Sequence, residues 1–359
     1  MKVFDVVIIG YGIVGKRRHH YIDLHKNLNA VAVCDVRFLD KEFRDGNGSI
    51  YNNYDDIEKM SKKKKESGKM SNGVMYFSDY ADLLENIEYD IVFVSLPNYL
   101  APKVTMIALS NGAHVFCEKP PGRTVQDIEE VIKVENKYKS LKLKYGFNHR
   151  YHGSVIKAKK IIDSEIFGKI INMKGVYGKS SIVPVKKEWR SMSKYSGGGI
   201  LLDQGIHMLD LFRFFCGDFD EIKSFVSNDY WNHDVEDNAY SIMKSKNGTV
   251  AMIHSSGTLW QHRFRLEISF EKGYLELSGI LSGSKSYGRE RLIIIKKIPN
   301  SNVGSLGKEE INYLRDESWK NEIDDFVKCI LENKKVEIGS SEDALNVMKL
   351  VHDIYSSDK

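Results

Sequence analysis

The sequence predicts a chain of two domains, an α/β half with a parallel, doubly wound sheet and an α+β half with a large, mostly antiparallel sheet. Length is the first observation, since 359 residues exceed what one hydrophobic core usually supports. The second is the alternation of apolar strands with helical segments in residues 1–148. The third is a change of period after that point, to short alternating strands joined by turns.

Apolar runs in the first half are typical of buried strands, at residues 3–9, 30–34, 90–97, 113–117 and 141–147. Helical segments lie between them, which is the order that produces a parallel sheet. The lysine-rich stretch SKKKKESGKMSNG interrupts this order. We interpret residues 51–73 as a solvated surface insertion, because four adjacent lysines repel one another and no aromatic residues are interleaved with them.

In the second half the apolar residues alternate with polar ones, at residues 171–177, 222–227, 239–245, 249–256, 264–270, 274–279 and 291–297. Turn pairs such as Asn247-Gly248 separate these strands, so the sheet should be mostly antiparallel. Helices are predicted at residues 201–216, 319–332 and 341–355. We therefore assign residues 1–148 to one domain and residues 149–359 to a second, which would bind substrate and a further subunit.

Composition excludes several classes of protein. The net charge is only +4, with 53 basic and 49 acidic residues interspersed, so a nucleic-acid partner is not expected. The four cysteines form no C-x-x-C pair, and the start of the chain does not resemble a secretory signal. No apolar run is long enough to cross a bilayer. We expect a cytoplasmic protein without membrane contact.

A glycine motif follows the first strand and opens the first helix. Gly10, Gly12 and Gly15 form G-x-G-x-x-G with Ile13 and Val14 inside it, and Asp35 follows the second strand. In this setting the glycines allow a tight turn and close approach of a pyrophosphate, and Asp35 accepts hydrogen bonds from a ribose. The motif predicts a Rossmann domain that binds NAD. Arg37 could reach a 2′-phosphate, so NADP remains an alternative.

Two further elements carry candidate chemistry. Lys119 follows the strand at residues 113–117, at the sheet edge where such folds bind ligands, and desolvation there could lower its pKa. Asp203 and His207 are four residues apart on the helix predicted from Leu201, so the carboxylate can orient the imidazole. The triple glycine at residues 197–199 would let the backbone fold tightly against a ligand.

Together these motifs resemble the Gfo/Idh/MocA oxidoreductases along nearly the whole chain. The resemblance rests on seven segments: GYGIVG, Leu96-Pro97-Asn98, HVFCEKP, Gly146-Phe147-Asn148 with Arg150, Trp189-Arg190, GGGILLDQGIHMLDL and Val235-Glu236-Asp237. Two departures are Ala101, where many relatives carry histidine, and the second proline after the lysine.

The resemblance implies a role for each matching residue. Lys119, Asp203 and His207 would be catalytic, with His207 the acid/base and Lys119 holding the substrate hydroxyl. The cofactor would be contacted by Leu96, Pro97, Asn98, Glu118, Lys119 and Arg190. The resemblance also implies a cis Lys119–Pro120 bond and a homodimer or homotetramer formed through the open sheet face.

The function expected is hydride transfer between a nicotinamide cofactor and a secondary alcohol or ketone of a sugar, polyol or nucleotide-sugar. The alternatives are an NADP-dependent keto-sugar reductase and a non-catalytic NAD-binding sensor. No metal site is expected, because the remaining histidines lack ligand spacing. Packing is favoured over sugar stacking for a last set of aromatic and imidazole groups, Trp231, His233, Trp260 and His262.

Overall fold

The computed structural model describes residues 2–39, 65–180, 188–280, 286–297 and 306–358. They divide into two compact units. The first unit consists of Met1–Gly146, Lys186–Gly197 and Trp319–Ala344, and the second of Phe147–Val185, Gly198–Ser318 and Leu345–Lys359. After residue 148 the chain therefore returns to the first unit twice. The predicted division into residues 1–148 and 149–359 does not include these two returns.

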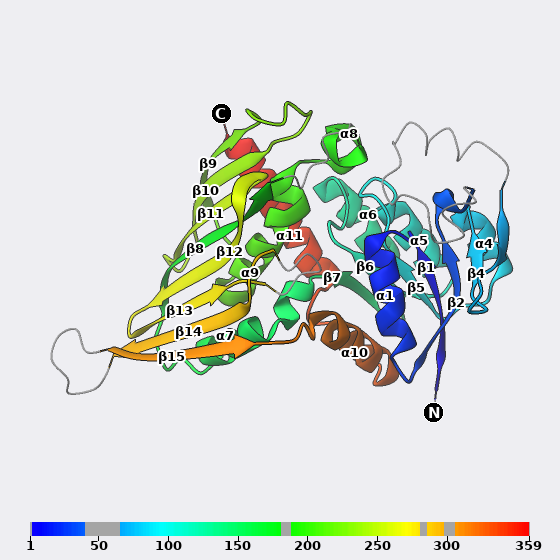
Figure 1. Cartoon of the computed structure of the whole chain (residues 1–359), viewed down its shortest axis with the longest axis horizontal. Helices are drawn as coiled ribbons and strands as arrows, with labels where there is room; N and C mark the ends of the chain where they lie inside the picture. Colours follow the sequence, from blue (N-terminus) through cyan, green and yellow to red (C-terminus); the bar gives the residue numbers. More distant parts are fainter. Residues whose placement is uncertain (1, 40–64, 181–187, 281–285, 298–305, 359) are drawn as a thin grey trace. The chain divides into compact units, whose positions relative to one another are not determined.

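The first unit contains a seven-stranded sheet in the order β3-β4-β2-β1-β5-β6-β7 (Figure 1). Every pair is parallel except β3 with β4, so the predicted parallel sheet is confirmed. The strands are β1 Phe4–Ile9, β2 Leu28–Cys34, β3 Ser67–Lys69, β4 Met75–Phe77, β5 Ile91–Val94, β6 His114–Glu118 and β7 Leu143–Gly146. The helices are α1 Ile13–Asp23, α4 Tyr80–Asn86, α5 Ala101–Ser110, α6 Val125–Glu135, α8 Ser193–Ser196 and α10 Ser318–Leu331, with 3₁₀ turns η1 Val36–Leu39 and η3 Trp189–Ser191.

Part of the expected surface insertion belongs to this sheet. Residues 40–64 lie outside the described part of the chain. Beyond them, β3 pairs antiparallel with β4, and β4 pairs parallel with β2. β3 is the edge strand of the sheet and is largely exposed, which explains why its residues SGK show no apolar pattern.

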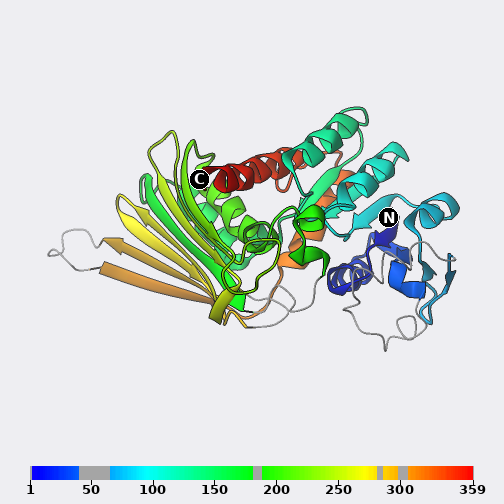
Figure 2. The same cartoon turned by 90° about the horizontal axis from the view of Figure 1, so that it is seen from above.

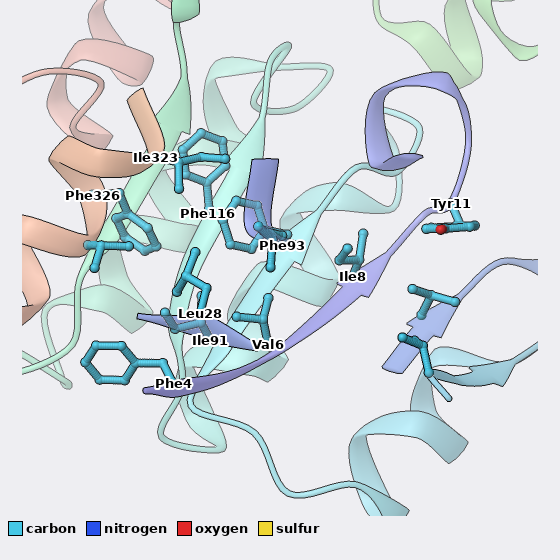
Figure 3. Packing of buried hydrophobic residues seen from close by; sticks show 14 of the residues in the cluster. Phe4, Val6, Ile8, Tyr11, Leu28, Ile91, Phe93, Phe116, Ile323 and Phe326 are labelled. Atoms are coloured by element: carbon cyan, nitrogen blue, oxygen red, sulfur yellow. The ribbon is translucent and has the colours of Figure 1, made fainter. Parts of the chain in front are cut away.

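The core of the first unit includes α10, which comes from the far end of the sequence. Ile323, Phe326, Val327 and Ile330 of this helix are buried in one cluster with strand residues such as Phe93 and Phe116. The Phe326 ring meets Phe116 and Phe93 edge-on, at centroid distances of 5.6 and 6.3 Å (Figure 3). α10 thus covers the sheet as an integral part of the Rossmann unit.

The second unit contains an eight-stranded sheet in the order β15-β14-β13-β12-β8-β11-β10-β9 (Figure 1). All pairs are antiparallel except β8 with β11, so the mostly antiparallel sheet is confirmed. Its strands are β8 Ile170–Ser180, β9 Glu221–Ser227, β10 Asn238–Lys244, β11 Val250–Ser256, β12 Thr258–Phe270, β13 Gly273–Ser278, β14 Glu290–Lys297 and β15 Leu306–Tyr313. The sequence missed β15, whose residues LGKEEINY are mostly polar.

Helices pack on one face of this sheet (Figure 2). They are α7 Gly153–Asp163, α9 Ile206–Cys216 and α11 Ser341–Ser357, with a 3₁₀ turn η2 Asn148–Tyr151 and a π-helical turn η4 Leu201–Gly205. Gly175 of β8 lies against Met208 and Phe212 of α9, and Ser224 of β9 donates to the carbonyl of Ile354 in α11 at 2.5 Å. Among the described residues, none of the helices has the length and apolar character needed to span a membrane.

Replacing Phe326 by alanine should destabilise the first unit by roughly 3–5 kcal/mol, because a fully buried ring would leave a cavity between α10 and the sheet. Hydrogen exchange of the β5 and β6 amides measures this loss. Leu331→Ala is the matched control in the same helix, since Leu331 is 47% exposed and its loss should cost at most about 0.5 kcal/mol. Equal effects of the two changes would show that α10 is not part of this core.

Candidate active site

The glycine loop between β1 and α1 is packed as its motif predicts. Gly10 has a φ of +92°, and a Cβ there would overlap the carbonyl of Ser95, while a Cβ at Gly15 would overlap the carbonyl of Gly10. Gly12 is the N-cap of α1, and no side chain caps that helix end. A Cβ at Gly12 would meet Arg37 Nη2 at 3.4 Å. A helix N-terminus without a side-chain cap suits the phosphates of a dinucleotide.

Asp35 is buried beneath this loop and bound to Arg37. Its carboxylate accepts from Arg37 Nε at 2.8 Å and Nη2 at 2.5 Å, and from the backbone N–H of Tyr11 at 2.9 Å. Arg37 therefore neutralises the carboxylate that the sequence assigns to a ribose. Tyr11 is also fixed by its hydroxyl, which lies 2.6 Å from His19 Nδ1, and burial raises the pKa of Tyr11 to about 12.

Lys119 follows β6, and the Lys119–Pro120 bond is cis as predicted. The preceding Glu118 accepts from Arg18 Nε at 2.6 Å, and Arg18 Nη2 donates to Glu322 of α10, also at 2.6 Å. The fully buried guanidinium lies 4.3 Å from the ring centres of both Phe116 and Trp319. Burial raises the pKa of Glu322 to about 7. The carboxylate of Glu118 thus anchors the backbone from which Lys119 extends.

The other residues expected along the cofactor follow β5 or lie in the 188–197 segment. Leu96 and Pro97 are half-buried just after β5, and Asn98 is buried, with its amide donating to the carbonyl of Ser196 at 2.7 Å. The guanidinium of Arg190 in η3 lies 4.3 Å from the ring centre of Trp189. The loops after β1 and β5 flank the point where the strand order reverses, which is where α/β sheets bind ligands.

In the second unit, Asp203 and His207 lie where a π-helical turn joins an α-helix. Asp203 belongs to η4, and His207 is the second residue of α9. The helix predicted from Leu201 is present, but the sequence did not reveal its π-helical start. A π turn contains more residues than an α turn and is often found at functional sites, so the 3.6-residue spacing describes this pair only approximately.

Several aromatic and polar side chains surround this junction. His149 of η2 stacks on His207, with ring centres 3.7 Å apart and an interplanar angle of 14°. Gln204 Nε2 donates to Tyr287 Oη at 2.6 Å. Burial raises the pKa of Tyr287 to about 12, and it raises the pKa of Tyr177 further, so both hydroxyls stay protonated. These neighbours come from four separate segments, and no local pattern in the sequence marks them.

The triple glycine packs against protein groups, which corrects the expectation that it folds against a ligand. A Cβ at Gly199 would overlap the backbone carbonyl of Glu236, and one at Gly198 would overlap the Tyr355 hydroxyl. Within the first unit, a Cβ at Gly197 would overlap Arg123. The chain needs glycine at these positions because other parts of the fold already fill the space.

Glu236 holds the start of the helix that carries Asp203. Its buried carboxylate accepts from the N–H groups of Gly199 at 2.7 Å and Leu201 at 2.9 Å, and from the Tyr355 hydroxyl at 2.8 Å. Burial raises the pKa of Glu236, while these hydrogen bonds act in the opposite direction. The family motif Val235-Glu236-Asp237 thus contains the residue that fixes the π turn.

Arg150, another motif residue, holds α9 in place through an ion pair with Asp210. It donates from Nε and Nη2 to the two carboxylate oxygens of Asp210, at 2.8 and 2.6 Å, and both side chains are buried. Asp210 follows His207 by three residues, so this bidentate pair fixes the same turn of the helix.

Two of the aromatic candidates have contacts that favour packing. Trp231 Nε1 donates to the carbonyl of Gly257 at 2.9 Å, and its ring is nearly parallel to that of His233. Trp260 is 70% exposed. Only His262 approaches the surroundings of His207, with its ring centre 5.9 Å from that of Tyr287. No group of three metal-binding side chains occurs among the residues that the structure describes.

Comparison with known families gives two matches that together cover most of the chain. A model described as an oxidoreductase family with an NAD-binding Rossmann fold matches residues 4–147, and a GFO/IDH/MocA C-terminal domain model matches residues 155–276. The chain belongs to the Gfo/Idh/MocA oxidoreductase family. As a member it is an NAD(P)-dependent oxidoreductase, and the resemblance stated from the sequence is confirmed.

Several named dehydrogenases align with this chain. D-glucoside 3-dehydrogenase of Escherichia coli is 26% identical, over 98% of this chain and 94% of that protein. Levoglucosan dehydrogenase of Pseudarthrobacter phenanthrenivorans is 28% identical, over 42% of this chain and 39% of the other. A solved levoglucosan dehydrogenase, in complex with NADH and L-sorbose, superposes with a TM-score of 0.80 over 100% of this chain and 97% of that one, at 18% identity. The last comparison shows a shared fold.

Proposed function

We propose that this protein is an NAD-dependent dehydrogenase that transfers a hydride to or from a secondary alcohol carbon of a sugar, polyol or nucleotide-sugar. The observation that carries the proposal is the buried His207 beside Asp203, in surroundings rich in hydroxyl and amide groups. Such groups suit a ligand with several hydroxyls. The aligned relatives, a glucoside and a levoglucosan dehydrogenase, support the same substrate class.

Residues of the first unit would hold the cofactor. The N–H groups of the helix start at Gly12, Ile13, Val14 and Gly15 suit its pyrophosphate, with Gly10 providing the turn. Asp35 would accept from the ribose. Leu96, Pro97, Asn98, Glu118, Lys119 and Arg190 complete the proposed cofactor site. The bound nicotinamide supplies the hydride acceptor or donor.

The reaction we propose moves one proton and one hydride. As the C–H bond of the alcohol breaks and the hydride leaves, His207 takes the hydroxyl proton, so the carbon becomes a carbonyl. The ammonium of Lys119 would stabilise the negative charge that develops on the oxygen. Asp203 would stabilise the imidazolium that His207 becomes. In the reverse direction His207 returns the proton to the oxygen.

Replacing His207 by alanine should lower turnover by roughly a hundredfold or more, the usual contribution of a general acid/base. NADH affinity should hardly change, because the proposed cofactor residues lie in the first unit. NADH formation with a panel of sugars, polyols and nucleotide-sugars identifies a substrate, and steady-state rates with it compare the variants. Lys119→Ala should act similarly with some loss of substrate binding, and Asp203→Asn should cost less. Near-normal turnover by His207→Ala would exclude it as the base.

NADH should bind more tightly than NADPH, but by a modest factor, because Arg37 neutralises the carboxylate that would repel a 2′-phosphate. Fluorescence titration of both cofactors measures this preference. Arg37→Ala should widen it, since the variant keeps Asp35 and removes the cation that could bind the phosphate. Tighter binding of NADPH to the wild type would show that Arg37, not Asp35, determines the choice.

We propose that the open face of the second sheet binds another copy of the chain. Phe225 is 80% exposed there, and Tyr240, Ile242 and Met252 are exposed on neighbouring strands. An apolar patch of this kind is typical of an interface. Light scattering should give a dimer or tetramer for the wild type and smaller species for Phe225→Asp, because the carboxylate would be desolvated on assembly. A monomeric wild type would contradict the assignment.

A further inference from the structure

We propose that His149 is a positioning residue for His207, a neutral imidazole that lies flat on the catalytic ring and fixes its plane. The inference rests on the proposed role of His207 as acid/base. It comes from a stack of two buried rings and from a chain of hydrogen bonds whose direction can be derived step by step.

The stack joins two elements of the second unit. His149 comes from η2 and His207 from the first turn of α9, and each is 5% exposed. Their ring centres are 3.7 Å apart and their planes differ by 14°. This distance is van der Waals contact between nearly parallel rings, so no water can lie between them. Rotation of the His207 ring about its Cβ–Cγ bond would collide with His149.

The hydrogen-bond chain begins at an acceptor. The carboxylate of Asp316 can only accept, so the hydroxyl of Ser318, 2.6 Å away, donates to it. Ser318 Oγ then accepts from Asn148 Nδ2 at 3.3 Å. That contact orients the Asn148 amide and turns its Oδ1 towards His149 Nδ1, 3.2 Å away. His149 Nδ1 must therefore carry a proton and donate it.

The other nitrogen of His149 faces Tyr177, whose hydroxyl lies 3.2 Å from Nε2. Burial raises the pKa of Tyr177, so the hydroxyl keeps its proton and can donate it to Nε2. Both nitrogens of a neutral Nδ1–H imidazole are then satisfied in the plane of the ring. Hydrogen bonds at both ends of the ring prevent it from turning, so the face that it presents to His207 is fixed.

A neutral partner also suits the proposed chemistry. When His207 takes a proton, its positive ring lies against the π face of an uncharged imidazole, a favourable arrangement. Two imidazolium rings at this distance would repel each other strongly. Two pairs of polar groups near the stack are bound to each other, Arg150 to Asp210 and His152 to Glu290. Within the pair, the proton that the reaction releases therefore belongs on His207.

The test compares kinetic constants of His149 variants on a substrate that the wild type turns over. His149→Ala should lower kcat by about tenfold to a hundredfold, the cost of a misplaced catalytic group, with KM and NADH affinity little changed. His149→Phe keeps a flat ring but lacks both hydrogen bonds, so it should recover kcat only in part. His352→Ala is the control, because His352 is an exposed histidine on α11 of the same unit, away from the stacked pair in sequence. It should leave kcat unchanged.

A double-mutant cycle separates a positioning role from a structural one. If His149 acts through His207, adding His149→Ala to His207→Ala should not lower kcat further. Additive losses would overturn the proposal. If His207→Ala itself keeps full activity, the proposed function fails; if only His149→Ala keeps it, this inference alone fails.

A second readout needs no substrate. Long-range ¹H–¹⁵N spectra of histidine-labelled protein report which ring nitrogens carry protons. Near neutral pH we expect His149 to be protonated on Nδ1 and bare on Nε2, with its resonances assigned by their absence in His149→Gln. A proton on Nε2 would contradict the derived hydrogen-bond chain and overturn the proposal.

Discussion

The glycine loop and Lys119 depend on a fully buried cation of the first unit, the guanidinium of Arg18. A desolvated charge is costly unless it is paired, and here Glu118, Glu322 and two aromatic rings surround it. Arg18 belongs to α1, which begins at the glycine loop, and its partners belong to β6, which ends before Lys119, and to α10. The cluster therefore fixes the loop and the lysine relative to each other. It also explains Gly146, where a Cβ would lie 2.7 Å from Glu118 Oε2 and 3.2 Å from Arg18 Nη2.

In the second unit a similar problem, that of the buried carboxylate of Glu236, is solved by hydrogen bonds. Glu236 is buried among hydrogen-bond donors alone, two N–H groups and the Tyr355 hydroxyl. A carboxylate that accepts several such bonds can remain charged in a buried site. Here it ties three distant segments, the glycine-rich turn, the strand region before β10 and the C-terminal helix α11. The π-helical turn η4 starts at this carboxylate. The placement of Asp203 therefore depends on Glu236, which is 33 positions further along the chain, and on Tyr355, which is further still.

Local patterns predicted the parts of the fold whose causes are local. The glycine loop, the lysine after β6 and the helix at Leu201 follow from short-range turns and periodicity. β3 and β15 were missed because they are exposed edge strands, where no apolar alternation is required, and β4 was missed because it is only three residues long. The Arg18 cluster joins residues 100 and 304 positions apart, and the histidine stack joins residues 58 apart. No periodicity connects such positions, so only the folded chain reveals them.

The surroundings of His207 also bear on why a histidine suits this position. Burial raises the pKa of Tyr177 and of Tyr287, so neither hydroxyl gives up its proton near neutrality. Although burial acts to raise the pKa of Glu290, its hydrogen bonds and the charge of His152 lower it, so that carboxylate stays charged and does not compete for a proton. Asp210 is held by Arg150 through two bonds. The two tyrosines and Glu290 are therefore fixed in one protonation state across the neutral range, whereas an imidazole titrates within it. A histidine at position 207 can therefore accept a proton without passing that proton on to the neighbouring tyrosines or to Glu290.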